Sequence, residues 1–318
     1  MIDSGPYPTA PYPLPPMPAD EPTIADSWTL GRLLTWTTDF LREKGTDSPR
    51  LDAEVLLAHA RGCQRIELYT AFEEEADEPL RQAFRELVKR RAAGTPVAYL
   101  VGHREFFSLS FQITPDVLIP RPETELLVVR LLDVAKEITN QDKALRIADV
   151  GTGSGILAVC CAKHLPTCQV IALDISPAAL EVARANAQRH QVAERIEFWS
   201  SDLFAGYEGN GFDFVVSNPP YVASSEMAGL EADVREHEPG LALDGGEQGT
   251  AVIERLIPQA AQRLRPGGWF LMEVSPSNAT RVEQLLAEAY GLKPHETIAD
   301  LAGYPRVVQA VSTVRQDE

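Results

Sequence analysis

From Leu145 onwards the chain alternates between short apolar runs and segments with helical periodicity. The first apolar run is Arg146–Val150, and further runs follow at residues 169–173, 195–199 and 212–216. Strands that alternate with helices are typical of a doubly wound α/β fold, in which a mostly parallel sheet carries helices on both faces. Ligands of such sheets bind beyond the carboxyl ends of the strands, so the residues that follow each run are the candidates for function.

A glycine-rich loop follows the first of these runs. Its spacing is G-x-G-x-G, whereas a dinucleotide fingerprint is G-x-G-x-x-G, and Ile156 stands where the third glycine of that fingerprint would be. Glycines allow close approach of a ligand and present N–H groups at a helix N-terminus. The second run ends on Asp174, whose carboxylate can accept both hydroxyls of a ribose. These features predict a nucleoside-containing ligand, with Gly151, Thr152, Gly153, Ser154, Gly155 and Asp174 as candidate contacts.

The third run leads into Ser201-Asp202-Leu203-Phe204. The Asp202 carboxylate can accept a hydrogen bond from an exocyclic amino group, and apolar neighbours such as Leu203 can pack against a purine. Three successive strand ends therefore offer places for the linker, the ribose and the base of a nucleoside.

The fourth run ends at Asn218-Pro219-Pro220-Tyr221. Two consecutive prolines fix φ and remove two N–H donors, which leaves the carbonyls of Asn218 and Pro219 free to point into a cleft. The Asn218 amide adds a side-chain acceptor, and Tyr221 adds a flat ring with a polar tip. We expect this tetrapeptide to bind a planar NH2 group, with Asn218, Pro219 and Tyr221 as catalytic residues and Pro220 completing the substrate site.

A cofactor nucleoside beside a second substrate that bears NH2 is the arrangement that methyl transfer from S-adenosylmethionine requires. Asn218 stands where both would meet, so we expect it to contact the cofactor as well as the substrate. A positioned amide needs no buried histidine or lysine base, because the nitrogen becomes acidic once it is alkylated.

The rest of the chain divides into segments of different composition. Residues 1–26 carry eight prolines and four acidic side chains but no lysine or arginine, which predicts a disordered tail. Residues 27–100 show helical spacing without a catalytic constellation, and we expect a helical domain that recognises the substrate. We expect a β-hairpin linker at residues 101–120, the catalytic domain at residues 121–312, and a second tail at residues 313–318.

Three further segments carry expectations. The hairpin is predicted to have strands at residues 106–109 and 111–114. The polar, acidic stretch at residues 223–250 is long for a loop, and we expect it to gate the substrate cleft. Residues 269–274 and 307–311 are expected to pair as an antiparallel unit. Arg121 and Glu123, which precede a helix, either cap it or line the pocket.

Charge and composition restrict the possible partners. The 318 residues carry a formal charge of −17, which disfavours a nucleic-acid substrate, although one basic cluster lies at Lys89–Arg91. No apolar run reaches the roughly twenty residues of a membrane span. The four cysteines and six histidines show no metal-type spacing, so we expect reduced thiols of a cytoplasmic protein and no metal site. We also expect a monomer.

The motifs as a set resemble the HemK/PrmC family of class I methyltransferases. The resemblance rests on Asp149–Gly155, Asp174, Ser201–Phe204 and Asn218–Tyr221, together with Pro96–Gly102, Ile119–Glu125 and Leu51–Leu57. It implies a Rossmann-like domain with a mostly parallel seven-stranded sheet, a terminal antiparallel hairpin and a small N-terminal helical domain. It also implies that S-adenosylmethionine donates a methyl group to N5 of the glutamine in the Gly-Gly-Gln motif of peptide chain release factors. Glu273 is interpreted as structural.

Three other functions were weighed. An amino-methyltransferase for adenine or guanine of DNA or RNA would use the same tetrapeptide, but the acidic composition opposes it. A nicotinamide dehydrogenase is opposed by the glycine spacing. An inactive methyltransferase on a helical scaffold is opposed by the competent residues at every cofactor and amide position.

Overall fold

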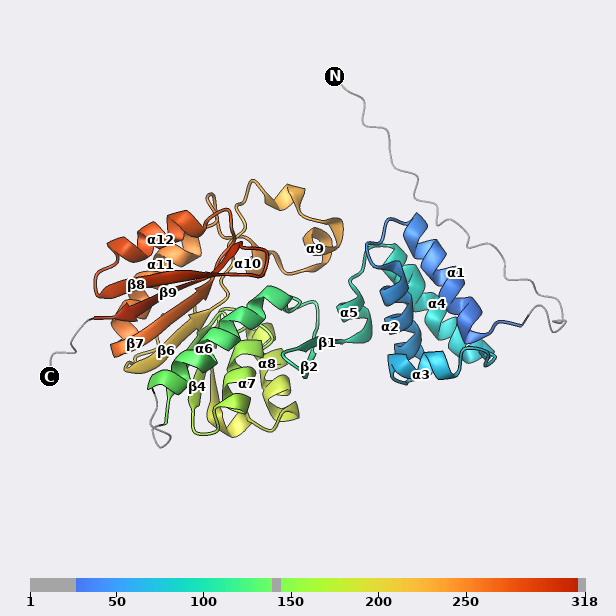
Figure 1. The fold of residues 1–318 in the computed structure, drawn as a ribbon, viewed down its shortest axis with the longest axis horizontal. Coiled ribbons are helices and arrows are strands. Elements are labelled where there is room, and N and C mark those ends of the chain that lie inside the picture. Colours follow the sequence, from blue (N-terminus) through green and yellow to red (C-terminus); the bar gives the residue numbers. More distant parts are fainter. Residues whose placement is uncertain (1–26, 139–143, 314–318) are drawn as a thin grey trace, which may run out of the picture. The chain divides into compact units, whose positions relative to one another are not determined.

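The computed structural model describes residues 27–138 and 144–313, and the chain divides into two compact units after Val88 (Figure 1). The tail predicted at residues 1–26 lies outside the described residues, as does the C-terminal tail from residue 314 onwards. None of the described helices combines the length and the apolar composition that crossing a membrane would need.

The first unit is helical. Its helices are α1 (Leu30–Glu43), α2 (Pro49–Arg61), α3 (Arg65–Thr70) and α4 (Glu78–Ala92), the last of which continues four residues past the division. Leu30, Leu34 and Leu41 share one buried face of α1, as their spacing predicts. Helix α3 was not predicted, because its six residues show too little periodicity.

The second unit begins with α5 (Val97–Val101) and a β-hairpin. Strands β1 (His103–Phe106) and β2 (Leu109–Gln112) pair with Phe106 opposite Leu109. The strand predicted at residues 106–109 is therefore wrong: Phe107 and Ser108 form the turn, with φ values of 48° and 60°. A two-residue hairpin turn needs positive φ, which glycine or asparagine normally signals, and this sequence carries neither residue there.

A seven-stranded sheet forms the centre of the second unit, in the order β5-β4-β3-β6-β7-β9-β8. Strand β9 runs antiparallel to both of its neighbours, and the other pairs are parallel. This confirms the predicted Rossmann-like fold and the antiparallel pairing of residues 269–273 with 307–311. The strands are β3 (Arg146–Val150), β4 (Gln169–Asp174), β5 (Ile196–Ser200), β6 (Phe212–Ser217), β7 (Leu264–Glu273), β8 (Leu292–Ala299) and β9 (Pro305–Ser312).

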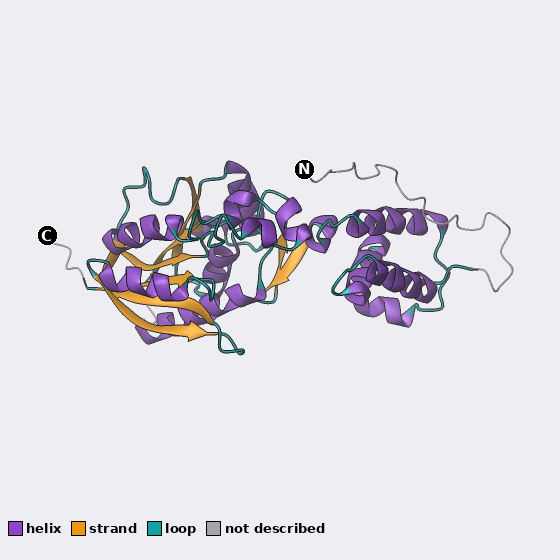
Figure 2. Cartoon of the chain, turned by 90° about the horizontal axis from the view of Figure 1, so that it is seen from above, coloured by secondary structure: helices purple, strands orange, loops and turns teal. Residues whose placement is uncertain are grey.

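Helices cover both faces of the sheet (Figure 2). One face packs against α6 (Glu125–Ile138), α7 (Ile156–His164) and α8 (Pro177–Arg189), and the other packs against α11 (Ala251–Arg263) and α12 (Ala279–Glu288). Alternate residues of β3 serve the two cores, since Ile147 joins the first and Ala148 the second. Short helical turns are η2 (Pro122–Thr124), η3 (Ala193–Arg195), η4 (Met227–Gly229), α9 (Ala232–His237) and α10 (Gly240–Leu243).

The sheet order places the site. Strand β3 lies between β4 and β6, so the chain moves away from it in opposite directions. The loops that follow these strands diverge and leave a crevice at their carboxyl ends.

Candidate active site

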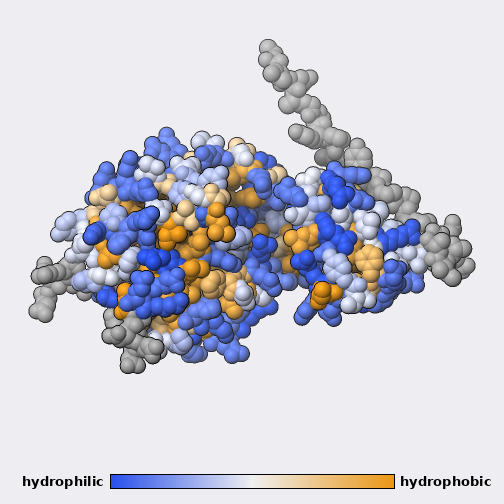
Figure 3. Space-filling model, viewed as in Figure 1, coloured by the Kyte–Doolittle hydropathy of each residue, from blue (hydrophilic) through white to orange (hydrophobic). Residues whose placement is uncertain are grey.

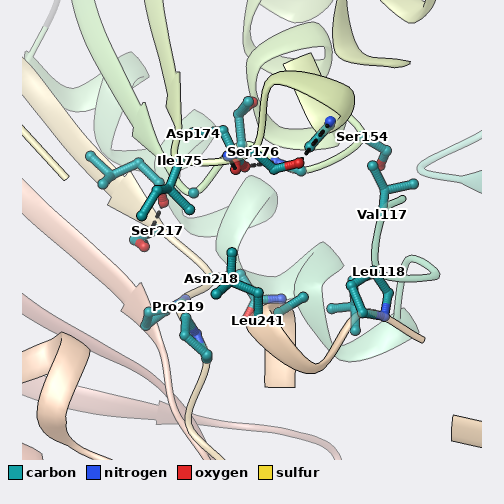
Figure 4. Close-up of a pocket in the computed structure, with 18 of the residues that line it drawn as sticks. Val117, Leu118, Ser154, Asp174, Ile175, Ser176, Ser217, Asn218, Pro219 and Leu241 are labelled. Atoms are coloured by element: carbon teal, nitrogen blue, oxygen red, sulfur yellow. Dashed lines mark hydrogen bonds between the residues drawn. The ribbon is translucent and has the colours of Figure 1, made fainter. Parts of the chain in front are cut away.

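A pocket of about 320 Å³ lies at this crevice, and it gathers residues that follow β3, β4, β5 and β6. That size suits a small organic ligand. Figure 4 shows Asp174, Ile175 and Ser176 from the end of β4, and Asn218 and Pro219 from the end of β6, within one pocket. Ten predicted site residues line it: Gly151, Thr152, Gly153, Ser154, Asp174, Asp202, Leu203, Asn218, Pro219 and Pro220. Gly155 and Tyr221 are not among the lining residues.

The glycine loop is shaped by its own hydrogen bonds. The N–H groups of Gly151 and Thr152 donate to the Leu173 carbonyl at 2.8 and 2.9 Å, and that of Gly153 donates to Asp174 Oδ2 at 2.8 Å. The expectation that this loop presents N–H groups to a ligand is therefore wrong for these three. A phosphate needs such donors, so the loop suits a ligand without phosphate.

Gly155 acts through packing. Its φ is +81°, and a Cβ at this position would lie 3.0 Å from the Ala183 Cβ and 3.1 Å from the Ala183 Cα. The absence of a side chain lets α7 begin close to α8, which holds the loop in place.

Asp149, the residue before Val150 in β3, lies beneath the loop and is fully buried. Its Oδ2 accepts hydrogen bonds from the Thr152 hydroxyl at 2.6 Å and from the Ala158 N–H at 3.0 Å, whereas Oδ1 has no partner among the described residues. Burial raises the pKa of this carboxyl to about 7. The contacts with Thr152 and Ala158 tie the loop to the start of α7.

Asp174 is the acceptor that a ribose would meet. Each of its oxygens accepts one backbone N–H, Oδ1 from Ser176 at 2.8 Å and Oδ2 from Gly153 at 2.8 Å. Burial raises the pKa of the Asp174 carboxyl, and these N–H groups oppose that shift. A carboxylate has about four acceptor positions, so a lone pair on each oxygen remains for the two hydroxyls of a ribose. The remaining acceptor positions of Asp174 therefore fit the ribose of a nucleoside.

Asp202 and Leu203 lie on the wall formed by the end of β5. Asp202 pairs with Arg255 at 2.5 Å, and both side chains are roughly half exposed. Arg255 also lines the pocket, and sequence reasoning missed it because it lies in α11, far from any motif. Leu203 has a φ of +54°, and its apolar side chain is part of the pocket wall.

Asn218 is oriented by Thr124. The Asn218 Nδ2 donates to the Thr124 hydroxyl at 3.2 Å, which leaves Oδ1 as the available acceptor. No backbone N–H of the described residues donates to the Pro219 carbonyl. Among the described residues, the Asn218 Oδ1 and the Pro219 carbonyl oxygen thus remain available as acceptors, and both residues line the pocket. Thr124 was overlooked in the sequence, although it follows Arg121 and Glu123, which were considered.

Tyr221 lies behind the pocket wall. Its hydroxyl donates to Glu273 Oε1 at 3.2 Å, and its carbonyl accepts from Asn278 Nδ2 at 3.3 Å. Burial raises the pKa of the Tyr221 hydroxyl. In this structure the ring packs against the core formed with α11 and α12, so its expected contact with an NH2 group is not seen.

The pocket rim is tied by a buried ion pair. Glu238 accepts from the Arg121 guanidinium at 2.6 Å and from the Ile119 N–H at 3.1 Å, and its side chain is 1% exposed. Arg121 lines the pocket, whereas Glu123 lies 3.9 Å from Arg306 outside the lining. Leu241, which is 64% exposed, is one of the residues that line the pocket. The face shown in Figure 3 carries both hydrophilic and apolar areas.

The segment at residues 223–250 is more ordered than a loop, since it contains η4, α9 and α10. Its glycines pack on the tetrapeptide. A Cβ on Gly249 would lie 2.4 Å from the Tyr221 carbonyl oxygen, and one on Gly245 would lie 2.8 Å from that of Pro220. Among the described residues no three His, Cys, Asp or Glu side chains converge as a metal site would require.

Comparisons with known proteins agree with this geometry. Two family models match the chain: the PrmC N-terminal domain at residues 32–102 and the Methyltransferase small domain at residues 124–233. The second match covers the glycine loop, Asp174, Asp202 and the tetrapeptide.

Several curated relatives match nearly the whole chain. A release factor glutamine methyltransferase of Rhodopirellula baltica is 50% identical over 88% of this chain and 95% of its own length. Those of Koribacter versatilis and Geobacter sulfurreducens are 44% and 38% identical, over 84% and 88% of this chain and 93% and 96% of their own lengths.

Solved structures share the fold. The catalytic domain of hMettl16 in complex with a 3′UTR hairpin matches with a TM-score of 0.51, over 73% of this chain and 84% of that chain, at 16% identity. A likeness at this identity shows the architecture and carries no functional residue across.

Proposed function

This chain belongs to the HemK/PrmC family of release factor glutamine methyltransferases, and from that premise we propose how its pocket performs the reaction. The substrate is the glutamine of the Gly-Gly-Gln motif in peptide chain release factors, and its side-chain nitrogen, N5, receives the methyl group. S-adenosylmethionine supplies that methyl group in electrophilic form on a sulfonium.

The residues that hold the cofactor follow from their chemistry. Asp174 accepts the ribose hydroxyls, the carboxylate of Asp202 accepts the adenine amino group, and Leu203 packs on the base. The loop of Gly151, Thr152, Gly153 and Ser154 provides space for the linker. Asn218 stands at the end of this pocket nearest the second substrate.

Asn218 and Pro219 then act on the glutamine. An amide nitrogen is a poor nucleophile because its lone pair is delocalised into the carbonyl. Two acceptors placed out of the amide plane, the Asn218 Oδ1 and the Pro219 carbonyl, favour the pyramidal geometry that frees the lone pair. Hydrogen bonds that strengthen in the transition state are the ones that accelerate the reaction. Alignment of the reacting atoms contributes more, roughly 7 to 11 kcal/mol.

The observation that carries this assignment is that Asn218 and Pro219 line the same pocket as Asp174 and residues 151–154 of the glycine loop, and that the Asn218 amide donates to Thr124 through Nδ2. Tyr221 supports the wall from behind through Glu273. We propose further that residues 27–100 recognise the release factor, that residues 223–250 gate the cleft, and that the enzyme works as a cytoplasmic monomer without binding nucleic acid. The acidic charge supports the absence of nucleic-acid binding, and the 50% identical release factor glutamine methyltransferase supports a release factor as the partner.

Transfer of labelled methyl groups tests the substrate. The purified chain is incubated with labelled S-adenosylmethionine and a release factor, the same factor with its motif glutamine replaced by alanine, duplex DNA, or transfer RNA. Label on the intact release factor alone is the expected result. Label on a nucleic acid, or equal label on the alanine variant, would contradict the proposal.

A further inference from the structure

The amide orientation of Asn218 decides whether the site can bind an NH2 group. A side-chain amide has an acceptor on one side and two donors on the other, and the two orientations have nearly the same shape. With Oδ1 toward the pocket the site accepts from an NH2 group. With Nδ2 toward the pocket, the amide hydrogens of Asn218 would face the hydrogens of the substrate NH2 group, and no hydrogen bond could form.

Thr124 is the group that distinguishes these orientations. It is the last residue of η2, is fully buried, lines the pocket, and lies 3.2 Å from Asn218 Nδ2. A hydroxyl has one hydrogen to donate. If that hydrogen is directed elsewhere, the hydroxyl oxygen can only accept from Asn218, and Oδ1 must face the pocket.

Glu273 provides the place for that hydrogen. This carboxyl ends β7 and is 2% exposed. Its Oε1 accepts from Tyr221, whereas its Oε2 is buried without a partner that meets ordinary hydrogen-bond geometry in the described structure. The Thr124 hydroxyl nevertheless lies close enough to lower the pKa of Glu273 as a donor does, against the larger rise caused by burial. An ionised carboxylate only accepts, so it draws the Thr124 hydrogen toward itself.

We propose that Thr124 and Glu273 are positioning residues, which together keep the Asn218 amide turned with Oδ1 toward the NH2 group of the substrate. Glu273 accepts from Thr124, Thr124 accepts from Asn218, and Asn218 accepts from the substrate. The inference rests on the proposed function and assigns Glu273 a role beyond the structural one that the sequence suggested.

Four variants test the chain of hydrogen bonds. T124V removes the hydroxyl at nearly constant volume, and T124S keeps it. E273Q keeps the acceptor for Tyr221 but puts an amide nitrogen in place of Oε2. That nitrogen donates to Thr124, so Thr124 donates to Asn218 and the amide turns the wrong way. In T124V/E273Q, valine has no hydroxyl that could donate to Asn218, so the glutamine at position 273 cannot reverse the Asn218 amide.

We expect T124V to lower kcat about tenfold and T124S to stay near wild type, since one hydrogen bond is at stake. E273Q should lower kcat about a hundredfold, because a donor now faces the NH2 group. The double variant should be about ten times more active than E273Q. Binding of S-adenosylhomocysteine and the melting temperature should stay near wild type throughout. T297V is the matched control, because Thr297 lies in β8, is not among the residues that line the pocket, and donates its hydroxyl hydrogen to the Glu283 carboxylate.

A wild-type kcat in T124V, or a double variant less active than E273Q, would overturn the inference. It would also be overturned if E273Q lost cofactor affinity or melting temperature in proportion to its loss of kcat. These outcomes are separate from failure of the proposed function. If the wild type methylates a nucleobase amine instead of a release factor, the proposed function fails. The same ranking of variants on that amine still tests the inference, because it also presents an NH2 group.

Discussion

Asn218 is the residue on which the chemistry depends, because its Oδ1 is one of two oxygens available to an amide at the end of β6. The replacement N218A removes that acceptor without touching Asp174 or the glycine loop. We expect kcat to fall roughly a hundredfold, as it does when other enzymes lose one preorganised polar group, while affinity for S-adenosylhomocysteine changes little. Single-turnover kinetics with calorimetric titration measure the two effects. Loss of cofactor binding together with turnover would mean that Asn218 mainly holds the cofactor.

Protonation of Glu273 should make the turnover number depend on pH. Burial raises the pKa of this carboxyl, and the charge of Glu123 raises it further. The hydroxyl groups of Thr124 and Tyr221 and the charge of Arg306 lower it, and the Tyr221 hydroxyl donates a hydrogen bond to Oε1. Below the raised pKa the protonated carboxyl can donate to Thr124 and reverse the Asn218 amide. We therefore expect kcat, measured at saturating cofactor, to fall as the pH drops through this pKa. An identical acid limb in T124V, which cannot transmit the reversal, would show that another group titrates.

At the scale of elements, the contact between residues 245–249 and the tetrapeptide demands glycine. Gly249 has φ +70°, and an added Cβ would lie 2.4 Å from the Tyr221 carbonyl oxygen. We expect G249A to lower the free energy of unfolding of the second unit by roughly 1 to 3 kcal/mol and to reduce turnover, because the backbone around Tyr221 must shift. Chemical denaturation and kinetics measure both. The control is G229A, where no atom lies within 4 Å and φ is not positive; equal effects of the two substitutions would refute the argument.

The segment at residues 223–250 gives a prediction about motion. Its buried Glu238 is tied to Arg121 and the Ile119 N–H, while η4 and the start of α9 are more exposed. If the segment gates the cleft, S-adenosylhomocysteine together with a glutamine peptide should slow its cleavage by a protease. Mass spectrometry of the fragments identifies the sites. Cleavage in this segment at an unchanged rate would argue that it is a fixed wall.

Local patterns predicted some of these elements and not others. The alternation after Leu145 gave the parallel strands, because a buried strand and an amphipathic helix each leave a strong periodic signal. The turn at Phe107 and Ser108 was missed because both residues have positive φ although neither is glycine. Strand β8 was missed because most of its residues are exposed, so it lacks the apolar pattern of a buried strand. The functional residues at the carboxyl ends of the strands could be predicted from the sequence. Arg255 and Thr124 could not, because only the tertiary structure brings them to the pocket.

At the scale of the whole molecule, the two units suit different tasks. Among the described residues, those that line the pocket all belong to the second unit. The charge of −17 repels a phosphate backbone, so a protein substrate is the consistent choice. The PrmC N-terminal domain model matches residues 32–102, so the helical region belongs to the same family as the catalytic unit, and its recognition of the release factor stays a proposal.

Methyl transfer in this pocket depends on an amide nitrogen that Asn218 and Pro219 hold. Fragmentation mass spectrometry of a release factor, before and after incubation with the enzyme and S-adenosylmethionine, tests it most directly. We expect one added methyl group, on the side-chain nitrogen of the glutamine in the Gly-Gly-Gln motif, and none in the N218A reaction. A methyl group on a lysine, a carboxylate or any other residue of the factor would contradict it.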